Sequence, residues 1–287
     1  MASLREATPW WIKVAGKLVL SRLPVPYRAW RSLGIFRHGA MLSPDYARAV
    51  FQKHFERARP FLPESFRVLE LGPGDSLATA ILAAAEGSAE TYLVDAGPFA
   101  DHRIDAYRPL FESEGQKLAA ARLDFEDIRA MMTALRAHYL TGGLESLRRL
   151  PSDSIHVTFS HAVLEHTPKD EFAETVRELF RLQAPGGFGS HQIDLQDHLG
   201  RSLNSLRFSP AVWESAAFRN AGFYTNRLRA SQVLDVFRGA GYEVVSAQTE
   251  KWHGPPLGRG SLHSSLRSLS EDDLLTFSLD LVVRKRL

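Results

Sequence analysis

The chain has 287 residues, of which 44% are hydrophobic and 24% are charged. This composition fits one large globular domain, or a core domain with a small appendage, and excludes a disordered or fibrous protein. Lys and Arg number 35 against 33 Asp and Glu, so the net charge of +2 gives no electrostatic drive towards nucleic acid. The chain holds no cysteine, which excludes disulfides, zinc–thiolate sites and thiol nucleophiles.

The N-terminal region predicts a short amphipathic helix and no membrane span. Its apolar stretch, residues 10–20, is interrupted by Lys13 and Lys17 and falls short of the roughly 20 apolar residues that cross a bilayer. We therefore expect a cytoplasmic protein without a secretory signal. We expect the apolar face of this helix to pack on the core, and we do not favour the alternative, contact of residues 9–31 with a membrane surface. That face consists of Trp11, Val14, Ala15 and Leu18.

A second helix is expected to begin at Ser43, which can cap it, with Pro44 in its first position. Pro60 marks the end of this helical region. We expect residues 1–60 to form an N-terminal helical cap and residues 61–287 to form the main domain.

From Phe66 the pattern changes to that of an α/β domain. Residues 66–71 and 91–94 are typical of buried strands, and the Ala-rich residues 77–85 between them are typical of a helix. Strand, helix and strand form a βαβ unit, which indicates a mostly parallel sheet covered on both faces.

The rest of the chain continues this alternation. Further strands are expected at residues 138–141, 154–159, 189–193, 242–247 and 276–283. Helices are expected within residues 101–136, after Thr167, and over residues 231–238. Pro185-Gly-Gly187 is expected to turn the chain into the fifth strand, and the polar, aromatic residues 195–230 are expected to form a lid insertion.

The most informative stretch follows the first strand and reads Val68-Leu-Glu-Leu-Gly-Pro-Gly-Asp-Ser76. Glycines at this place let the backbone turn sharply and approach a ligand closely. A loop that binds a dinucleotide would have a third glycine where Leu77 stands, and Asp75 would face its phosphates, so an NAD-dependent enzyme is the less favoured interpretation. Glu70, near the end of the strand, suits a ligand with a cationic ammonium group.

This loop resembles motif I of the class I S-adenosylmethionine-dependent methyltransferases, in which an acid and two glycines follow the first strand. Tyr92-Leu-Val-Asp95 resembles their second motif, whose acid takes the ribose hydroxyls. Ser160-His-Ala-Val-Leu-Glu-His166 is similar to the fourth-strand segment of methyltransferases of the ubiquinone and menaquinone biosynthesis type. Leu182-Gln-Ala-Pro-Gly-Gly187 is similar to the turn before their fifth strand. Four motifs in the family's order, within residues 62–195, make the resemblance specific.

The resemblance implies a Rossmann-like seven-stranded sheet of order 3-2-1-4-5-7-6 whose last strand is antiparallel. It also implies S-adenosylmethionine as the cofactor. The residues that it assigns to the cofactor are Glu70, Gly72, Pro73, Gly74, Asp95, Ala96, Glu145, Ser160 and His161. Among these, Glu145 is only a candidate adenine contact, assigned because the family often has an acidic or polar residue near the adenine after the third strand. As a departure from the family, residues 101–136 are longer than the minimal fold needs.

The acceptor chemistry is expected beyond the carboxyl ends of the strands, where ligands of open α/β sheets bind. We expect His198, which follows the fifth strand, to be the general base for a hydroxyl acceptor, oriented by Asp194 or Asp197. His161 is the second candidate for the base. A divalent metal is not favoured, because these residues lack a third clear ligand at a defined spacing. Two further histidines that we expect to be structural are His166 and His191.

The lid and the loop after the sixth strand supply the candidate substrate contacts. Aromatic faces there alternate with Asn and Arg donors, a combination that suits a polar ring such as a sugar; packing of these aromatics on the sheet is the alternative. The candidates are Arg207, Trp213, Tyr224, Asn226, Arg227 and His253.

Taken together, these patterns predict an enzyme that methylates an oxygen of a small polar acceptor, such as a sugar or a glycan or natural-product intermediate. A non-catalytic S-adenosyl-binding or scaffold protein of the same fold is one alternative, because a fold alone does not establish a function. The NAD-dependent Rossmann enzyme is the other. No nucleic-acid partner is expected.

Overall fold

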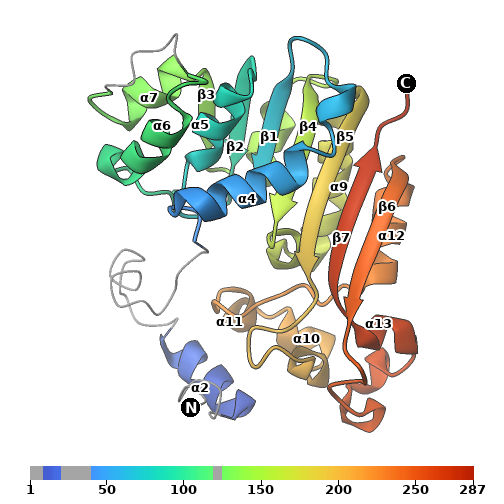
Figure 1. Cartoon of the computed structure of the whole chain (residues 1–287). Coiled ribbons are helices and arrows are strands. Elements are labelled where there is room, and N and C mark those ends of the chain that lie inside the picture. Colours follow the sequence, from blue (N-terminus) through green and yellow to red (C-terminus); the bar gives the residue numbers. More distant parts are fainter. Residues whose placement is uncertain (1–8, 21–39, 119–124) are drawn as a thin grey trace.

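A computed structural model describes residues 9–20, 40–118 and 125–287, and its centre is a seven-stranded sheet (Figure 1). The strand order is β3-β2-β1-β4-β5-β7-β6, and β7 runs antiparallel to both of its neighbours. The predicted order and the predicted antiparallel last strand are therefore confirmed. The strands are β1 (Arg67–Leu71), β2 (Glu90–Val94), β3 (Ala137–Leu140), β4 (Ile155–His161), β5 (Gln183–Asp194), β6 (Glu243–Lys251) and β7 (Thr276–Arg284).

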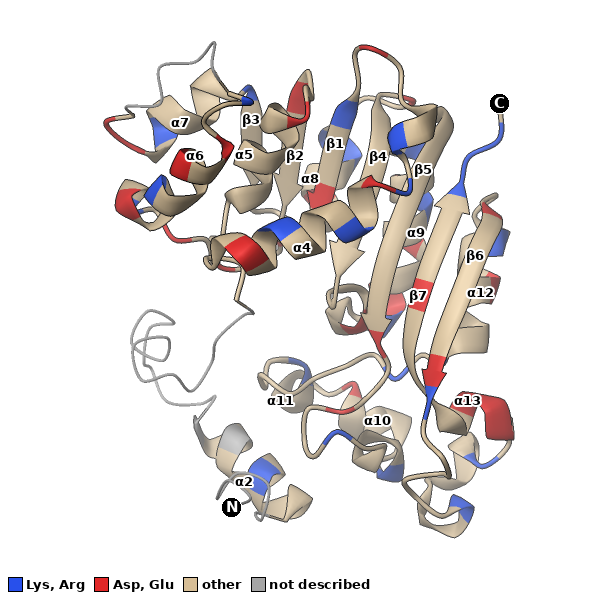
Figure 2. Cartoon of the chain, viewed as in Figure 1, with Lys and Arg blue, Asp and Glu red and all other residues tan. Residues whose placement is uncertain are grey.

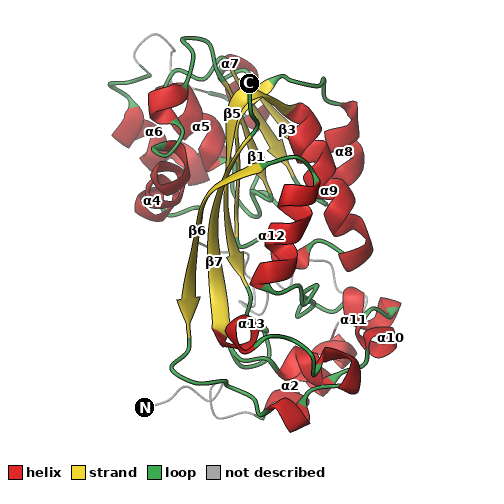
Figure 3. Cartoon of the chain, turned by 90° about the vertical axis from the view of Figure 1, so that its right-hand side faces the viewer, coloured by secondary structure: helices red, strands yellow, loops and turns green. Residues whose placement is uncertain are grey.

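Helices cover both faces of the sheet (Figure 3). One face carries α4 (Pro44–Phe55), α5 (Ala78–Ala85), α6 (Arg108–Glu114) and α7 (Ile128–Ala134), and the other carries α8 (Leu144–Arg149), α9 (Lys169–Leu182) and α12 (Ala230–Gly239). The remaining helices are the N-terminal α2 (Trp10–Leu20), α10 (Pro210–Trp213) and α11 (Ala216–Arg219) in the segment after β5, and α13 (Glu271–Leu275) before β7.

The two hydrophobic layers follow from the alternation of side chains along each strand. In β1, Val68 packs into the cluster under α4 and α5, whereas Leu69 and Leu71 pack into the cluster under α9 and α12. Because successive side chains of a strand point to opposite faces, an apolar run such as this one is buried on both sides. This is why β1 sits at the centre of the sheet.

Strand β5 begins six residues earlier than predicted, at Gln183. Ile155 of β4 pairs with Gln183, but Val157 already pairs with Phe188, so the residues in between bulge out of the ladder. The Pro-Gly-Gly sequence makes this bulge possible, since Gly186 has a φ of +79°. The expected turn is therefore a bulge inside the strand.

Helix α2 packs on the segment after β5 with only part of the face that the sequence predicts. Val14 is buried in a cluster with Leu199 and Trp213, and Trp10 and Leu18 pack against the same cluster. Trp11 is 58% exposed. The predicted face is thus wrong for Trp11 and Ala15, which point outward; the contacts instead recur every four residues along one side of the helix.

Charges of both signs are spread over the surface, as the small net charge leads one to expect (Figure 2). Among the described residues, no helix combines the length and the apolar character that a membrane span needs. The part of the proposed membrane contact over residues 21–31 lies outside the described residues.

Candidate active site

The glycine loop after β1 is built on left-handed backbone conformations. Gly72 has a φ of +74° and Gly74 a φ of +64°, values that cost glycine little and other residues more. Gly72 also lies against the chain that follows β4, because a Cβ at this position would come within 2.4 Å of Cγ1 of Val163. Pro73 is buried between the two glycines. The loop therefore depends on glycine for both its conformation and its packing.

Asp95 joins this loop to the end of β2. Its Oδ2 accepts a hydrogen bond from the backbone N–H of Gly74 at 2.9 Å, and its Oδ1 accepts one from Ala96 at 2.7 Å. Burial raises the pKa of Asp95 to about 6, although these backbone donors favour the charged form. The two motifs that the sequence assigned to the cofactor thus meet in space.

Glu70 lies beneath the loop and is 3% exposed. Among the described residues its Oε2 has no hydrogen-bond partner. Burial raises the pKa of Glu70 to about 8, the nearby Thr79 hydroxyl offsets part of this shift, and the charge of Asp95 adds to it. A buried carboxyl with one oxygen left without a partner fits a ligand that brings positive charge, as the ammonium and sulfonium groups of S-adenosylmethionine do.

A cavity of about 430 Å³ opens at the ends of β2 and β3, and its size is that of a small-ligand pocket. It borders the end of β2, because Gly143, which lines it, donates a backbone hydrogen bond to the carbonyl of Asp95 at 2.8 Å. The predicted cofactor residues Ala96 and Glu145 both line it, and Glu145 forms an ion pair with Arg148 there. The predicted adenine contact thus lies beside the predicted ribose contact.

Strand β4 ends beside the same loop, because Ser160 pairs with Leu71 of β1. The Ser160 hydroxyl, however, is fully buried and lies 2.9 Å from Nδ1 of His191. The structure directs this side chain into the core, so only the backbone of Ser160 borders the loop. The prediction that His191 is a hydrogen-bonded core histidine is confirmed.

His161, the last residue of β4, faces α4 instead. Its Nδ1 lies 3.1 Å from Nε2 of His54, and Nδ1 of His54 lies 2.8 Å from the Ser190 hydroxyl. Burial, together with the positive charge of Lys53, lowers the pKa of His161 to about 4, so its ring is neutral at pH 7. His54 was not predicted as a site residue, because the sequence of α4 shows only the apolar pattern of a helix that packs on the core.

Three further side chains meet beyond the ends of β4 and β5, and we refer to them as the Glu165 cluster. Glu165 and His166 come from the 3₁₀ turn η3 (Leu164–His166), and His198 comes from the loop after β5. One nitrogen of each ring and one carboxylate oxygen lie within 4.8 Å of one another. The two rings meet edge to face, with 4.9 Å between their centroids.

Glu165 is the buried member of this cluster and was missed by the sequence analysis. It is 2% exposed, and neither carboxylate oxygen has a hydrogen-bond partner among the described residues. Burial raises its pKa well above the usual range, and nearby backbone N–H groups offset only part of this shift. The signal was present in the sequence, since an acid next to His166 directly after a strand lies where such folds bind ligands.

The carboxylates predicted to orient His198 both accept backbone hydrogen bonds. Oδ1 of the buried Asp197 accepts from the N–H groups of Leu199 and Gly200 at 3.0 Å each. Oδ1 of Asp194 accepts from Gln196 at 2.9 Å, and burial raises the pKa of Asp194. Asp197 therefore fixes the turn of backbone that carries His198.

Two of the predicted substrate contacts lie inside the hydrophobic cluster of the segment after β5. Trp213 is fully buried, and its Nε1 donates to the carbonyl of Thr225 at 2.7 Å. Tyr224 is 6% exposed, and its hydroxyl donates to Glu214 at 2.8 Å. The prediction of substrate contact is wrong for these two residues, because their faces and polar atoms are used within the protein.

Asn226 and Arg227 are buried in the same way. The Asn226 side-chain amide donates to the carbonyl of Leu164 at 2.8 Å and to that of Thr167 at 3.1 Å. Arg227 donates to the carbonyl of Phe208 at 2.8 Å and lies over the ring of Trp213. The predicted substrate contact is therefore wrong here too, and Asn226 instead clamps both ends of the turn that carries Glu165.

The last two predicted substrate contacts lie nearer the surface. Arg207 is half-buried and its guanidinium lies 5.3 Å from the ring centre of Trp10 in α2. His253 is exposed in the loop after β6. Contact of either residue with a substrate stays a prediction.

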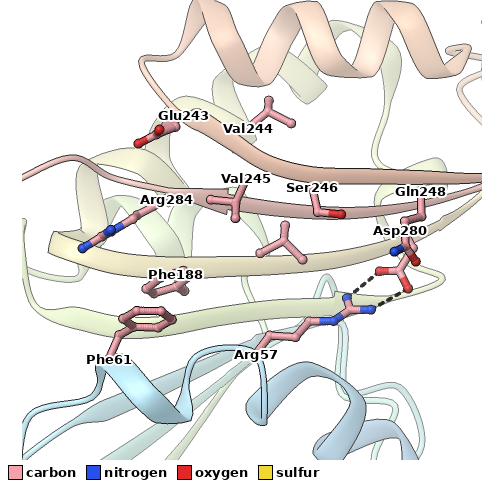
Figure 4. A pocket seen from close by; sticks show the side chains of 11 residues that line it. Arg57, Phe61, Phe188, Glu243, Val244, Val245, Ser246, Gln248, Asp280 and Arg284 are labelled. Atoms are coloured by element: carbon pink, nitrogen blue, oxygen red, sulfur yellow. Dashed lines mark hydrogen bonds and ion pairs between the residues drawn. The ribbon is translucent and has the colours of Figure 1, made fainter.

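A larger cavity, of about 540 Å³, lies on the face of β5, β7 and β6 that α4 leaves uncovered (Figure 4). Phe61 and Phe188 stack on one of its walls, and Arg57 forms an ion pair with Asp280 at 2.6 Å on another. This cavity is lined by the faces of the strands and not by their carboxyl ends. It is therefore not where the fold places a ligand of the glycine loop.

The sheet, with its antiparallel last strand and with a glycine loop joined to the acid of β2, defines a class I S-adenosylmethionine-dependent methyltransferase. The sequence matches the family model of the methyltransferase domain over residues 44–247, so the chain belongs to this family. The residues that fit the cofactor are those of the glycine loop together with Glu70, Asp95 and the cavity at β3.

Comparison with solved structures finds methyltransferases that are similar to this chain at low sequence identity. A SAM-dependent methyltransferase from Methanosarcina mazei is 14% identical, with a TM-score of 0.48 over 80% of this chain and 96% of that one. One from Mesorhizobium loti is 14% identical, with a TM-score of 0.45 over 80% and 97%. A putative methyltransferase from Bacillus halodurans is 13% identical, with a TM-score of 0.46 over 83% and 100%. Comparison with curated proteins finds no match.

Proposed function

We propose that this methyltransferase methylates an oxygen of a small polar acceptor that binds over the ends of β4 and β5. When bound, S-adenosylmethionine supplies a methyl group on a positively charged sulfur. Because this donor is reactive in itself, the residues of the chain have chiefly to hold the acceptor in line and to take its proton. The observation that carries the proposal is that two sets of imidazoles border this place, His161 with His54 on one side and the Glu165 cluster on the other.

We assign the proton transfer to His161, the second candidate of the sequence analysis. Its ring is neutral at pH 7 and is held by His54 through Nδ1. In the tautomer that we propose, Nδ1–H of His161 donates to His54, and Nδ1–H of His54 donates to Ser190. Arg57 donates to the same hydroxyl oxygen at 3.0 Å, which supports Ser190 as an acceptor. Nε2 of His161 then carries the free lone pair of a base.

The proposed step balances without a further reactant. With the cofactor bound, the acceptor oxygen would form the new C–O bond with the methyl carbon, and the carbon–sulfur bond would break with its electron pair left on sulfur. The hydroxyl proton passes to Nε2 of His161. A hydroxyl gains more from such a base than an amine does, because an alkoxide is much harder to form than a neutral amine.

His198 keeps a role on the acceptor side in this proposal. Its ring is exposed and stands beside His166, and buried Asp197 fixes the turn that carries it. We propose that His198 and the other members of the Glu165 cluster bind the acceptor. The proton transfer is then left to His161, whose ring is oriented by His54.

The test is a screen of sugars, glycosides and phenols that measures the release of S-adenosylhomocysteine, followed by NMR assignment of the new methyl group. We expect turnover with a hydroxyl acceptor and a methyl group on oxygen. A methyl group on nitrogen or carbon would contradict the proposal. Tight S-adenosylmethionine binding with no turnover on any acceptor would instead support the non-catalytic alternative.

A further inference from the structure

We infer that the Glu165 cluster is a binding site for a divalent transition-metal cation such as Zn²⁺ or Co²⁺. Its ligands would be one carboxylate oxygen of Glu165 and one ring nitrogen each of His166 and His198, which lie within 4.8 Å of one another. One carboxylate and two imidazoles form a ligand set that proteins use for such cations. The inference goes beyond methyl transfer, because a cation can bind here whatever the acceptor is.

The buried carboxylate is the first observation that points to a cation. Glu165 is 2% exposed, and both of its oxygens lack a hydrogen-bond partner among the described residues. Nor does any Lys or Arg of the described segments form an ion pair with it. Buried carboxylates are normally paired, hydrogen-bonded or bound to a metal, because leaving them alone in the interior is costly. A cation between Glu165 and the two rings would supply the missing partner.

The hydrogen bond of His166 is the second observation. Its Nδ1 lies 2.9 Å from the backbone carbonyl oxygen of Tyr224, and a carbonyl can only accept, so Nδ1 carries the proton. Nε2 is then the nitrogen with the lone pair. Metal-binding histidines commonly donate their other N–H to a backbone carbonyl or a carboxylate in this way, because it fixes the tautomer and the ring.

Buried side chains hold the backbone of all three ligands. Asn226 clamps η3 through the carbonyls of Leu164 and Thr167, and its own N–H donates to the carbonyl of Glu165 at 2.7 Å. Asp197 fixes the turn that carries His198. A tetrahedral site needs ligand atoms about 3.4 Å apart, for bonds of about 2.1 Å. Because the ring of His166 is held by Tyr224, it is the exposed ring of His198 that has to turn for the three atoms to reach this distance.

The ligand set also indicates which cations fit the site and that a bound cation would keep a free coordination position. Mg²⁺, Ca²⁺ and Mn²⁺ prefer sites made of oxygen atoms, so the two imidazoles favour Zn²⁺ or Co²⁺. Three protein ligands leave at least one position for water or for an oxygen of a bound molecule. If the proposed function holds, an oxygen of the acceptor would take that position.

The test uses the full chain without a histidine tag, freed of metal with a chelator and measured without cofactor or acceptor. It is titrated with CoCl₂ while the visible d–d absorption of bound Co²⁺ is recorded, and ZnCl₂ is then added to displace it. We expect one Co²⁺ per chain. His198→Ala and Glu165→Gln should each weaken binding by about 10- to 100-fold or more. His102→Ala, which removes an exposed histidine outside the cluster, should leave Kd unchanged.

Thermal unfolding in the absence of metal shows that each variant is folded. In the wild-type protein ZnCl₂ should also raise Tm, and in His198→Ala it should not, because a ligand that binds only the folded state stabilises it. Absence of a Co²⁺ spectrum would overturn the inference. So would binding that persists at the same Kd in both cluster variants. Because no acceptor is present, these results do not depend on whether the proposed methyl transfer is correct.

Discussion

Replacement of Gly72 by alanine tests how the glycine loop is built. The new Cβ would lie 2.4 and 2.5 Å from the two Cγ atoms of Val163, at a φ of +74°. The backbone conformation alone costs an alanine about 1–2 kcal/mol. The overlap with Val163 adds about 1–3 kcal/mol, the usual cost of an overpacked site. We therefore expect Gly72→Ala to lower the free energy of unfolding by about 2–5 kcal/mol.

Gly87 provides a matched control, because its φ is +87° and a Cβ there would meet no atom within 4 Å. Gly87→Ala should therefore cost only the backbone part, about 1–2 kcal/mol. Urea unfolding of both variants measures the difference. Adding Val163→Ala to Gly72→Ala should recover part of the loss, seen as a favourable coupling energy in the double-mutant cycle. The prediction is contradicted if Gly72→Ala lowers the free energy of unfolding no more than Gly87→Ala does, or if the coupling energy is zero.

Three further predictions concern other parts of the molecule. His161→Ala should lower turnover by about 10²-fold, the lower end of the usual range for a general base because a pKa of about 4 makes the ring a weak base, and should leave S-adenosylmethionine affinity unchanged. Because the neutral ring is the active form, kcat/KM of the wild type should stay flat from pH 8 until the pH approaches 4. Burial alone would raise the pKa of Asp280, but hydrogen bonds from Arg57 and Lys53 outweigh it and lower the pKa to about 2. Asp280→Asn should therefore cost about 1–2 kcal/mol of stability at neutral pH, and this cost should vanish as the pH falls from about 4 to about 2, as urea unfolding at each pH would show. Asn226→Ala should destabilise the protein by about 1–3 kcal/mol, because it leaves the part-buried carbonyl of Thr167 without its donor and leaves the carbonyl of Leu164 with only the longer bond from the Thr167 N–H.

Each of these has an outcome that would contradict it. An acid limb of the rate profile near pH 6.5 would show that a histidine with an ordinary pKa, and not His161, is the base. A stability loss in Asp280→Asn that persists at pH 2 would mean that the residue acts through packing and not through its charge. Wild-type stability of Asn226→Ala would show that water replaces the amide at both carbonyls.

The fold was predictable because its signals are local. The run of residues 66–71 followed by two glycines indicates a strand and a loop without any knowledge of distant residues. The start of β5 was not predictable in the same way, because it depends on which residue of β4 each residue of β5 pairs with. Pro185 and the two glycines after it predict a turn, whereas the register between β4 and β5 makes them part of a bulge.

In the candidate site too, the residues of local motifs could be predicted, and those that only tertiary packing brings together could not. Gly74 and Asp95 belong to motifs that can each be recognised within a few residues of sequence, and the two residues are hydrogen-bonded in the structure. His54 and His161 stand 107 positions apart, and only the packing of α4 on the sheet brings their rings together. Glu165 became a candidate only once its burial and its lack of a partner were known.

The segment after β5 shows why its composition misled the sequence analysis. Aromatic rings with Asn and Arg donors look like a surface that binds a sugar, yet the same residue types satisfy the backbone of a long irregular loop. The carbonyls of Thr167 and Phe208, which Asn226 and Arg227 bind, accept no backbone hydrogen bond from the described residues, and carbonyls away from water need a donor. Asn226 therefore acts indirectly, because it binds both ends of η3, the turn that carries Glu165. It follows that Asn226→Ala should weaken Co²⁺ binding although Asn226 offers the cation no ligand, whereas loss of stability without loss of Co²⁺ affinity would separate the clamp from the site.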